Sequence, residues 1–342
     1  MTCRLALRQR GAALLTAMVI VTLVATLAAA MVWQQWQAVQ VEAAERAQTQ
    51  AQWILNGALD WARLILREDA RNGGPDELSE PWAVPLSEAR LSTFLSNDGT
   101  TTDDAPEAFL SGGIRDAQAR YNLRNLAHGG KVDATELATL QRLCEAVALS
   151  PDWARRLAQG VAAASPQGGA ERPARDTSGG TPPPRTDAQR EPPEVSTPTE
   201  DQGLMPPSED QLAWLGVDAK VLAPLLPHIV LLPKPTPVNL NTAAKEVISA
   251  VLGIDLATAE RLVQTRQRQP LRNPEDARSV IGPTVTLDPR RVGTGSNYFE
   301  ITGMLRLDQL VVAQRSLVER QALTVRTLRT ERIRKPNTSL QQ

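Results

Sequence analysis

The sequence predicts an α+β fold: a long N-terminal helix, partly membrane-spanning, packs on a small antiparallel sheet with a large inserted all-α domain. Three patterns lead to this class. An uncharged apolar stretch near the N-terminus continues into an amphipathic helical pattern. Apolar and polar residues alternate near the C-terminus, which indicates strands. Two helical hairpins precede these strands and form the predicted insertion.

The first element is a helix long enough to cross a membrane. Residues 12–33 carry no charge, and at about 1.5 Å per residue they reach about 33 Å, against a bilayer core of about 30 Å. Arg4, Arg8 and Arg10 precede them without an acidic residue. The positive-inside tendency therefore leaves residues 1–11 in the cytoplasm and the remainder of the chain outside it.

The helical pattern continues well beyond the membrane. Trp33 and Trp36 fall where the helix leaves the hydrocarbon, a favourable depth for indole rings. Apolar residues then recur every three or four positions as far as Leu66, and "RNGGP" at residues 71–75 ends the pattern. One helix from Ala12 to Ala70 would be about 90 Å long.

A cleavable secretory signal is the alternative interpretation of this stretch. "ATLAAAM" offers small residues for cleavage near Ala28 to Ala30, and the mature chain would then lack the apolar segment. Such a product would be a secreted protein, and this alternative would make it a secreted enzyme. Continuity with a long amphipathic helix argues against this alternative, because a discarded signal does not need to extend a folded element.

The basic leader, Gly11 and the long helix together resemble the type IV prepilin class. The resemblance implies that prepilin peptidase cuts between Gly11 and Ala12 and that the new amino group of Ala12 is methylated. It also places Thr16 at the fifth mature position, where most members carry a Glu that pairs with the neighbouring subunit's terminal amine. The first mature residue is usually Phe or Met, so Ala12 is a second departure. An ordinary single-pass anchor with an accidental glycine remains open.

Alternation predicts four strands in one antiparallel sheet. "IRDAQARYNLRNL" at residues 114–126 alternates as a half-buried strand would. Residues 297–307, 308–320 and 322–333 form three further candidates joined by tight connections, which indicates a meander. The earlier strand is expected to join the same sheet, with the long helix packed on one face.

A weak internal repeat occupies the predicted insertion at residues 127–292. One copy begins at Tyr121 and the other at Val238, and each opens with Asn-Leu followed by two amphipathic helices. Between the copies, residues 165–210 are rich in proline and charge and poor in large apolar side chains, so we expect a disordered loop. The predicted caps are Ser150 before Pro151, Gly253 at a helix end and Asp255 at the next helix start.

The order of these features resembles the K-type minor pseudopilins of type II secretion systems from end to end, apart from the long proline-rich loop. The resemblance implies a pseudopilin fold, a place at the pseudopilus tip, and a part in pseudopilus assembly and export of folded proteins across the outer membrane. It implies I-, J- and H-type subunits, the major pseudopilin and prepilin peptidase as partners. The location implied is a single pass of the inner membrane with the C-terminal domain in the periplasm.

Six segments follow from this interpretation. They are a leader at 1–11, a transmembrane helix at 12–33, a first core part at 34–126, the insertion at 127–292, C-terminal core strands at 293–334 and a tail at 335–342.

The second hairpin also resembles a helix-hairpin-helix module, which leaves a membrane-tethered DNA-uptake protein as the alternative function. Such modules bind phosphate through backbone N–H groups of a glycine-rich turn. Here Asp255 stands where a second glycine would serve, and its carboxylate repels phosphate. The 37 basic and 38 acidic residues balance to a net charge of −1, which gives no general attraction for nucleic acid. We therefore expect no nucleic-acid partner.

No catalytic set is evident in the sequence, and we expect a protein that is not an enzyme. His128 and His228 stand in predicted loops without a surrounding motif, and Cys144 lies on an apolar helical face typical of a buried thiol. The one cofactor that the family resemblance implies is structural calcium, bound in oxygen-rich loops. "SNDGTTTDD" has such a composition but lacks the spacing of a calcium loop, so a solvated turn is favoured. Its acidic residues are Asp98, Asp103 and Asp104.

Overall fold

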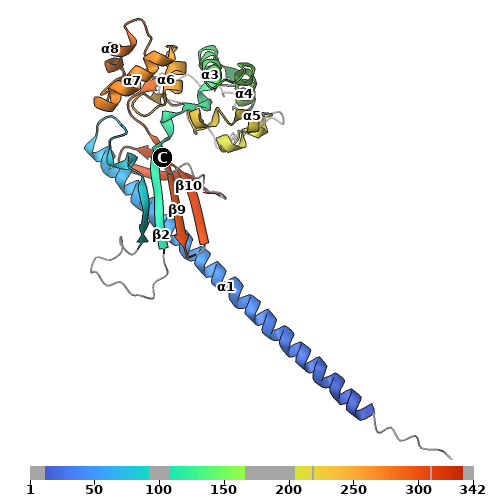
Figure 1. Cartoon of the computed structure of the whole chain (residues 1–342). Helices are drawn as coiled ribbons and strands as arrows, with labels where there is room; N and C mark the ends of the chain where they lie inside the picture. The colour runs from blue at the N-terminus through green and yellow to red at the C-terminus, as the bar shows by residue number, and fades with distance from the viewer. Residues whose placement is uncertain (1–11, 92–107, 166–204, 218, 309, 334–342) are drawn as a thin grey trace, which may run out of the picture.

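The protein is a long helical rod that carries a head at one end (Figure 1). The computed structural model describes residues 12–91, 108–165, 205–217, 219–308 and 310–333. Gly11 and the acidic loop with Asp98, Asp103 and Asp104 lie outside these residues, as does most of the predicted proline-rich loop.

The rod is helix α1, which runs without a break from Ala12 to Asn72 over 61 residues. The prediction of one continuous helix to Ala70 is confirmed. Its end follows from the two glycines after it, since Gly73 and Gly74 adopt φ values of 67° and 121° that disfavour residues with a Cβ atom. The N–H of Gly73 still donates to the carbonyl of Asp69 at 3.1 Å, which closes the last turn.

The head is built on a five-stranded antiparallel sheet in the order β1-β2-β9-β10-β11. The predicted C-terminal meander is confirmed, because β9, β10 and β11 are consecutive neighbours. An edge strand, β1, was not predicted from the sequence. The strands are β1 at Leu86–Arg90, β2 at Ala108–Asp116, β9 at Tyr298–Leu307, β10 at Leu310–Gln321 and β11 at Thr324–Ile333.

One face of this sheet lies against the upper part of α1 (Figure 1). Side chains spaced by three or four residues on the helix meet alternate side chains of the strands, so both periodicities converge on one core. Gly303 in β9 permits this close approach, because a Cβ atom there would lie 3.2 Å from the side chain of Leu55. The buried residues that α1 contributes are Ala51, Leu55, Leu59, Ala62 and Leu66.

The predicted strand at residues 114–126 is wrong beyond Asp116. The Asp116 side chain accepts from the backbone N–H of Gln118 at 2.7 Å, and Asn122 accepts from that of Arg124 at 3.0 Å. These local bonds turn the backbone away from the sheet, as Asp and Asn side chains often do. Gln118 and Asn122 are accordingly buried instead of facing solvent.

The insertion contains two helical hairpins together with short strands. Because of these strands, "all-α" describes it only approximately. The helices are α3 at Ala134–Ala146, α4 at Asp152–Ala164, α5 at Ala219–Leu222, α6 at Lys245–Leu252, α7 at Leu256–Arg268 and α8 at Arg278–Ile281. The short strands pair as β3 (Tyr121–Asn122) with β6 (Ile229–Val230), β4 (Ala127–His128) with β5 (Lys131–Val132), and β7 (Val238–Asn239) with β8 (Val292–Gly293). Turns of 3₁₀ helix occur at Pro81–Ala83, Ala117–Ala119, Leu123–Leu126, Glu209–Leu215, Leu226–His228 and Pro274–Ala277.

The predicted caps of the second hairpin are confirmed. Gly253 ends α6 in the left-handed region with φ of 68°, and Asp255 accepts from the N–H of Thr258 at 2.9 Å at the start of α7. In the first hairpin, α4 begins at Asp152, whose N–H donates to the hydroxyl of Ser150 at 3.3 Å. Ser150 therefore serves the helix start, although the helix begins one residue later than Pro151.

The two ends of the predicted proline-rich loop are packed. Ser165 is buried and its hydroxyl donates to the carbonyl of Val161 at 2.7 Å. Glu209 is also buried and forms an ion pair with Arg120 at 3.1 Å. These ends are in contact with α4 and with the segment between β2 and β3, so the boundaries at 165 and 210 lie inside folded structure.

Candidate functional site

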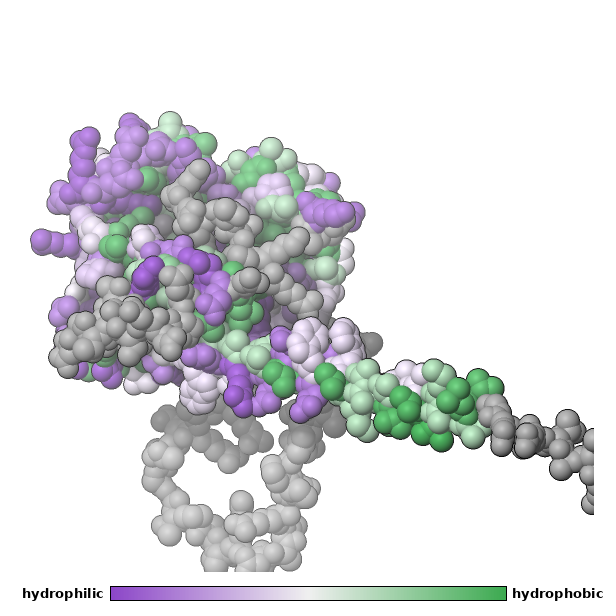
Figure 2. Space-filling model, turned by 60° about the horizontal axis from the view of Figure 1, so that its bottom comes forward, coloured by the Kyte–Doolittle hydropathy of each residue, from purple (hydrophilic) through white to green (hydrophobic). Residues whose placement is uncertain are grey.

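The free half of α1 is suited to a membrane. α1 is a helix long and apolar enough to span one, and it is the one such helix among the residues described. The part that projects from the head is mostly hydrophobic on the face shown in Figure 2. Its few hydroxyl groups donate to the helix backbone, as with Thr22 to Val19 at 2.9 Å and Thr26 to Leu23 at 2.9 Å. These bonds lower the cost of placing a hydroxyl in lipid.

The structure locates two of the three residues singled out for processing. Ala12 is the first residue of α1, and Thr16 lies one turn further on, with its hydroxyl donating to the carbonyl of Ala13 at 3.0 Å. Gly11 is outside the described residues. A buried carboxylate at position 16 would require a cationic partner, whereas a hydroxyl bonded within its own helix does not.

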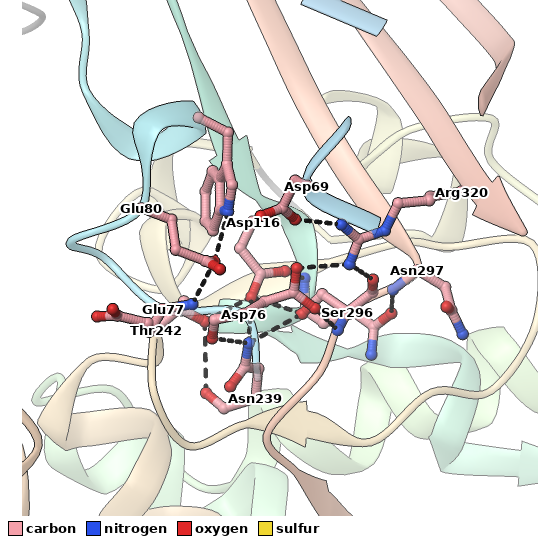
Figure 3. Close-up of polar contacts among 12 residues, drawn as sticks. Asp69, Asp76, Glu77, Glu80, Asp116, Asn239, Thr242, Ser296, Asn297 and Arg320 are labelled. Atoms are coloured by element: carbon pink, nitrogen blue, oxygen red, sulfur yellow. Dashed lines mark hydrogen bonds and ion pairs between the residues drawn. The ribbon is translucent and has the colours of Figure 1, made fainter. Parts of the chain in front are cut away.

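A second site lies where α1 meets the head, around the buried carboxylate of Asp116 (Figure 3). This carboxylate accepts from Asn239 at 2.9 Å, from the hydroxyl of Thr242 at 2.5 Å and from that of Ser296 at 2.6 Å. All these donors are neutral, and burial raises the pKa of Asp116 although the hydrogen bonds lower it. The carboxylate is thereby fully bonded without a direct cationic partner.

Arg320 neutralises the adjoining acidic residues. Its guanidinium donates to Asp69 at 2.6 Å and to Asp76 at 2.5 Å, and it lies over the ring of Phe299 with 4.7 Å between the guanidinium carbon and the ring centroid. Burial nevertheless raises the pKa of Asp76 to about 6, with Arg320 acting in the opposite direction. Burial also raises the pKa of Glu80 to about 7, although the backbone N–H of Glu77 donates to this carboxylate.

This cluster fastens the rod to both the sheet and the insertion. Asn239 donates to the carbonyl of Asp76 at 3.0 Å, to Asp116 and to the hydroxyl of Ser296 at 3.0 Å. It thereby joins the loop after α1, the end of β2 and the chain just before β9. Figure 3 shows these side chains converging from the separate segments. We call the seven residues of this cluster the junction: Asp69, Asp76, Glu80, Asp116, Asn239, Ser296 and Arg320.

No local sequence pattern predicts the junction as a whole, although the internal repeat contains a signal for Asn239. Asn122 and Asn239 occupy matching places at the start of the two repeats, and both are fully buried. Asn122 donates to the carbonyl of Lys234 at 2.7 Å and accepts from the N–H of Leu232 at 3.2 Å. A repeated Asn-Leu before an amphipathic helix therefore indicates an asparagine that bonds neighbouring backbone.

Asp69, Asp76 and Glu80 are the one group of three within the described residues whose carboxylate oxygens come close enough to hold a metal, within 4.8 Å of one another. Calcium takes six to eight oxygen ligands. Here the guanidinium of Arg320 already binds two of the three carboxylates. As arranged, these residues fit a cluster neutralised by arginine and do not form a calcium shell.

The two histidines and the cysteine, which are the side chains best suited to catalysis, lie outside this cluster. His128 is exposed in β4, and His228 is partly buried with its pKa lowered by burial. Cys144 is fully buried in α3, and burial raises the pKa of its thiol to about 11. A thiol protonated at neutral pH is a poor nucleophile, which agrees with the prediction of an inert cysteine.

Comparison with known proteins identifies the family. The family described as type II secretion system (T2SS), protein K, matches residues 119–234 and 238–284, which contain the two helical hairpins. Type II secretion system protein K of Pseudomonas aeruginosa is 28% identical over 280 residues, covering 78% of this chain and 75% of the relative. The chain belongs to the type II secretion system protein K family. Members of the protein K family are minor pseudopilins, and this chain is a minor pseudopilin of the secretion system.

A solved protein K assembly has the same fold. The crystal structure of the GspK-GspI-GspJ complex from the enterotoxigenic Escherichia coli type 2 secretion system contains a chain similar to this one. The TM-score is 0.60 at 18% identity, and the similarity covers 85% of this chain and 99% of that chain. The long helix and the mixed helix and sheet of the head are thus consistent with a pseudopilin fold.

Proposed function

We propose that this minor pseudopilin occupies the tip of the pseudopilus and takes part in its assembly and in the export of folded proteins. The supporting observation is the position of the insertion, which packs at the end of the sheet far from the free half of α1 (Figure 1). The junction holds it there through buried hydrogen bonds from Asn239. A head widened in this way obstructs another subunit from stacking above it.

The N-terminus of α1 supports the same position. In the prepilin class, an acid at the fifth mature position pairs with the terminal amine of a neighbouring subunit. This chain has Thr16 at that position if prepilin peptidase cuts between Gly11 and Ala12, and Ala12 begins the helix. A terminal subunit has no neighbour above it and does not need the acid. Cleavage there and methylation of Ala12 are part of the proposal.

The proposed location is the inner membrane, crossed once, with the head in the periplasm. Arg4, Arg8 and Arg10 on one side of the apolar stretch support this orientation. The proposed division is a leader at 1–11, the membrane helix at 12–33, and a pseudopilin core interrupted by the insertion.

The proposed partners are the I-, J- and H-type minor pseudopilins and the major pseudopilin, with prepilin peptidase as the processing enzyme. The similarity to a chain in a GspK-GspI-GspJ complex supports the I- and J-type subunits as partners. The exposed apolar surface of α1 also supports assembly with other membrane-anchored helices, since large exposed apolar patches mark interaction sites.

No observation favours the DNA-binding alternative. At the start of α7, the N–H of Thr258 is already bonded to the carboxylate of Asp255. The side chain of Asp255 therefore occupies the position in which a DNA phosphate would accept.

Intact-mass analysis and N-terminal sequencing of the membrane form test the processing step. We expect a chain that begins at methylated Ala12 and that co-purifies with the other minor pseudopilins. A mature chain that begins near Met31 would contradict the prepilin mechanism. Failure to co-purify with any pseudopilin would contradict the proposed place in the pseudopilus.

A further inference from the structure

The first hairpin is joined to the sheet by a separate segment, residues 205–217, which we call the strap. The strap contains the 3₁₀ helix Glu209–Leu215. Leu212 is buried in the core of the insertion, and Leu215 packs against Gly160 of α4. A Cβ atom on Gly160 would lie 2.9 Å from the Cβ of Leu215, so the glycine permits this close approach. One side of the strap is therefore packed tightly on the first hairpin.

On its other side, the strap is attached to the sheet through charged side chains. Glu209 forms an ion pair with Arg120 at 3.1 Å, and Arg120 forms another with Glu300 of β9 at 2.8 Å. Arg120 lies where the chain passes from the sheet into the insertion, and its guanidinium bridges a carboxylate of the strap and a carboxylate of the sheet. Asp210 adds a further ion pair, with Arg315 of β10 at 3.2 Å.

These two attachments differ in burial. The side chains of Glu209, Glu300 and Arg120 are 4%, 11% and 18% exposed. The side chains of Asp210 and Arg315 are 56% and 30% exposed. Exposed ion pairs contribute little because water and salt screen them, whereas removing one partner of a buried pair leaves a charge without compensation. The pairs of Arg120 therefore decide whether the strap stays on the sheet.

Glu300 remains charged in spite of its burial. Burial raises the pKa of Glu300, but the nearby guanidinium groups, with Arg120 first among them, more than offset this effect and lower the pKa from its ordinary value. An ionised Glu300 holds the guanidinium of Arg120 against the sheet. From this position the same guanidinium reaches Glu209 of the strap.

The strap's other polar atoms are incompletely bonded. The Oε2 atom of Glu209 and the Oε1 atom of Gln211 are buried and have no hydrogen-bond partner in the part of the chain that the structure describes. A buried acceptor without a donor costs free energy. The closed position of the strap therefore depends on the ion pair between Glu209 and Arg120.

We propose that Arg120 is a latch that fastens the strap, and with it α4, to the sheet. Loss of the pair with Glu209 releases the strap and lets the α4 side of the first hairpin move away from the sheet. The second hairpin, which lies beside the first (Figure 1), stays in place because Asn239 fastens it separately at the junction. The inference concerns the head itself and goes beyond the proposed function.

Hydrogen exchange of the full chain in detergent tests the latch. Glu209→Gln removes the charge of the strap and leaves the pair between Arg120 and Glu300 intact. Asp210→Asn is the matched control, because it makes the same chemical change at the next residue of the strap, in the exposed ion pair. The reporters are the N–H groups of Gln211 and Gly216, which donate within the strap to the carbonyls of Ser208 and Ala213 at 3.1 Å and 3.0 Å.

We expect exchange in the strap to become at least tenfold faster with Glu209→Gln and to change less than twofold with Asp210→Asn. Exchange in α6 and α7 should be unchanged in both variants. Equal responses of the strap to the two variants would overturn the inference. Faster exchange of α6 and α7 to the same extent as the strap would also overturn it, because Glu209 would then stabilise the head as a whole.

Substitutions of Arg120 separate the role of its charge from that of its bulk. Methionine and lysine are both unbranched and fill similar space, but only lysine can pair with the carboxylates. The strap should exchange at least threefold more slowly in Arg120→Lys than in Arg120→Met. Equal exchange in these two variants would mean that Arg120 acts by packing, and the latch would be overturned.

A distance between α4 and the sheet tests whether the strap fastens the hairpin. Spin labels are placed at Gln159, exposed on α4, and at Leu323, exposed in the turn between β10 and β11, in a chain whose Cys3 and Cys144 are replaced. Double electron–electron resonance should give one narrow distribution for the unaltered latch and for Asp210→Asn, and a broader distribution with longer distances for Glu209→Gln. The same narrow distribution in Glu209→Gln would overturn the proposal.

Discussion

The two halves of α1 form one continuous helix but are stabilised in different ways. Residues 13–46 are exposed on every side, and the first third of the helix is apolar all round. From Ala47 onward, one face is buried under the sheet and the opposite face is exposed. The lower half therefore requires lipid or neighbouring helices as its surroundings, whereas the upper half obtains its stability from the head. A single rod transmits the position of the membrane anchor directly to the head.

The largest expected effect of this difference lies in the buried face of the upper half. Leu66 is fully buried, so Leu66→Ala should lower the free energy of unfolding by about 2–5 kcal/mol. Leu64→Ala, two residues away on the exposed face, should change it by less than about 0.5 kcal/mol. Urea denaturation of the detergent-solubilised chain measures both. Equal losses would mean that the sheet does not cover α1 as described.

In the lower half, membrane insertion should be sensitive to an added charge, whereas the upper half is sensitive to a cavity in its core. Val24→Arg places a cation in the middle of the uncharged stretch and should cost about 2.5–3.5 kcal/mol in membrane insertion. The measurement is the fraction of chain that resists alkaline extraction from membranes. Asn56→Arg is the control and should leave this fraction unchanged. If the extraction-resistant fraction were unchanged in Val24→Arg, residues 12–33 would not span the membrane.

At the top of the rod, Asn239→Ala should lower the free energy of unfolding by about 1–3 kcal/mol. The reason is that the substitution leaves buried acceptors on Asp76, Asp116 and Ser296 without their shared donor. Hydrogen exchange should then increase in the loop after α1 and in residues 116–119. If exchange increased only around Asn239 itself, the junction would not couple the rod to the insertion.

The pattern of residues in the sequence predicted the rod and the meander because both depend on local periodicity. The apolar spacing that ends near Leu66 and the two glycines after Asn72 are enough to define α1. The junction depends on contacts between positions far apart in the chain, such as Asp76 with Arg320, and no local pattern specifies such pairs. β1 was missed for a related reason, since a short edge strand owes its register to β2.

The predicted strand at 114–126 shows the limit of alternation as a signal. The apolar side chains of Tyr121 and Leu123 are buried as expected, but so are Gln118 and Asn122. The carbonyl of Pro237 accepts from Gln118 at 3.0 Å, which accounts for the burial of this polar side chain. Hydrogen bonds of this kind arise from the tertiary fold and are not visible as periodicity.

A smaller effect concerns the pH dependence of the junction. The pKa of Asp76 is raised from 3.8 to about 6 and that of Glu80 from 4.5 to about 7. Between its unfolded and its folded pKa, each of these carboxyl groups binds more protons in the folded chain than in the unfolded chain. The stability that this protonation contributes is therefore present at low pH and is lost as the pH rises through 6 to 7. The free energy of unfolding should decrease from about pH 5 to about pH 8.

Asp76→Asn provides the control for this pH dependence. The decrease should become shallower in this variant, because the amide does not titrate. A slope identical to that of the unaltered chain would assign the pH dependence to groups outside the junction.

The smallest expected effect comes from the exposed face of the upper half. Gly57→Ala should raise the free energy of unfolding by about 1 kcal/mol, because alanine has the higher helix propensity and a Cβ atom meets no neighbour there. Thermal unfolding of the isolated chain measures this change. A loss of stability would mean that Gly57 is required for packing within the chain.

The continuity of the rod is the central claim, and a distance across the point where the helix leaves the membrane tests it most directly. Spin labels at Gln34 and Asn56, in a chain whose Cys3 and Cys144 are replaced, are separated by 22 residues of α1. An unbroken helix predicts one narrow distance distribution centred at about 33 Å by double electron–electron resonance in lipid nanodiscs. A broad distribution, or a mean well below this value, would reveal a joint between membrane and head and would contradict the account.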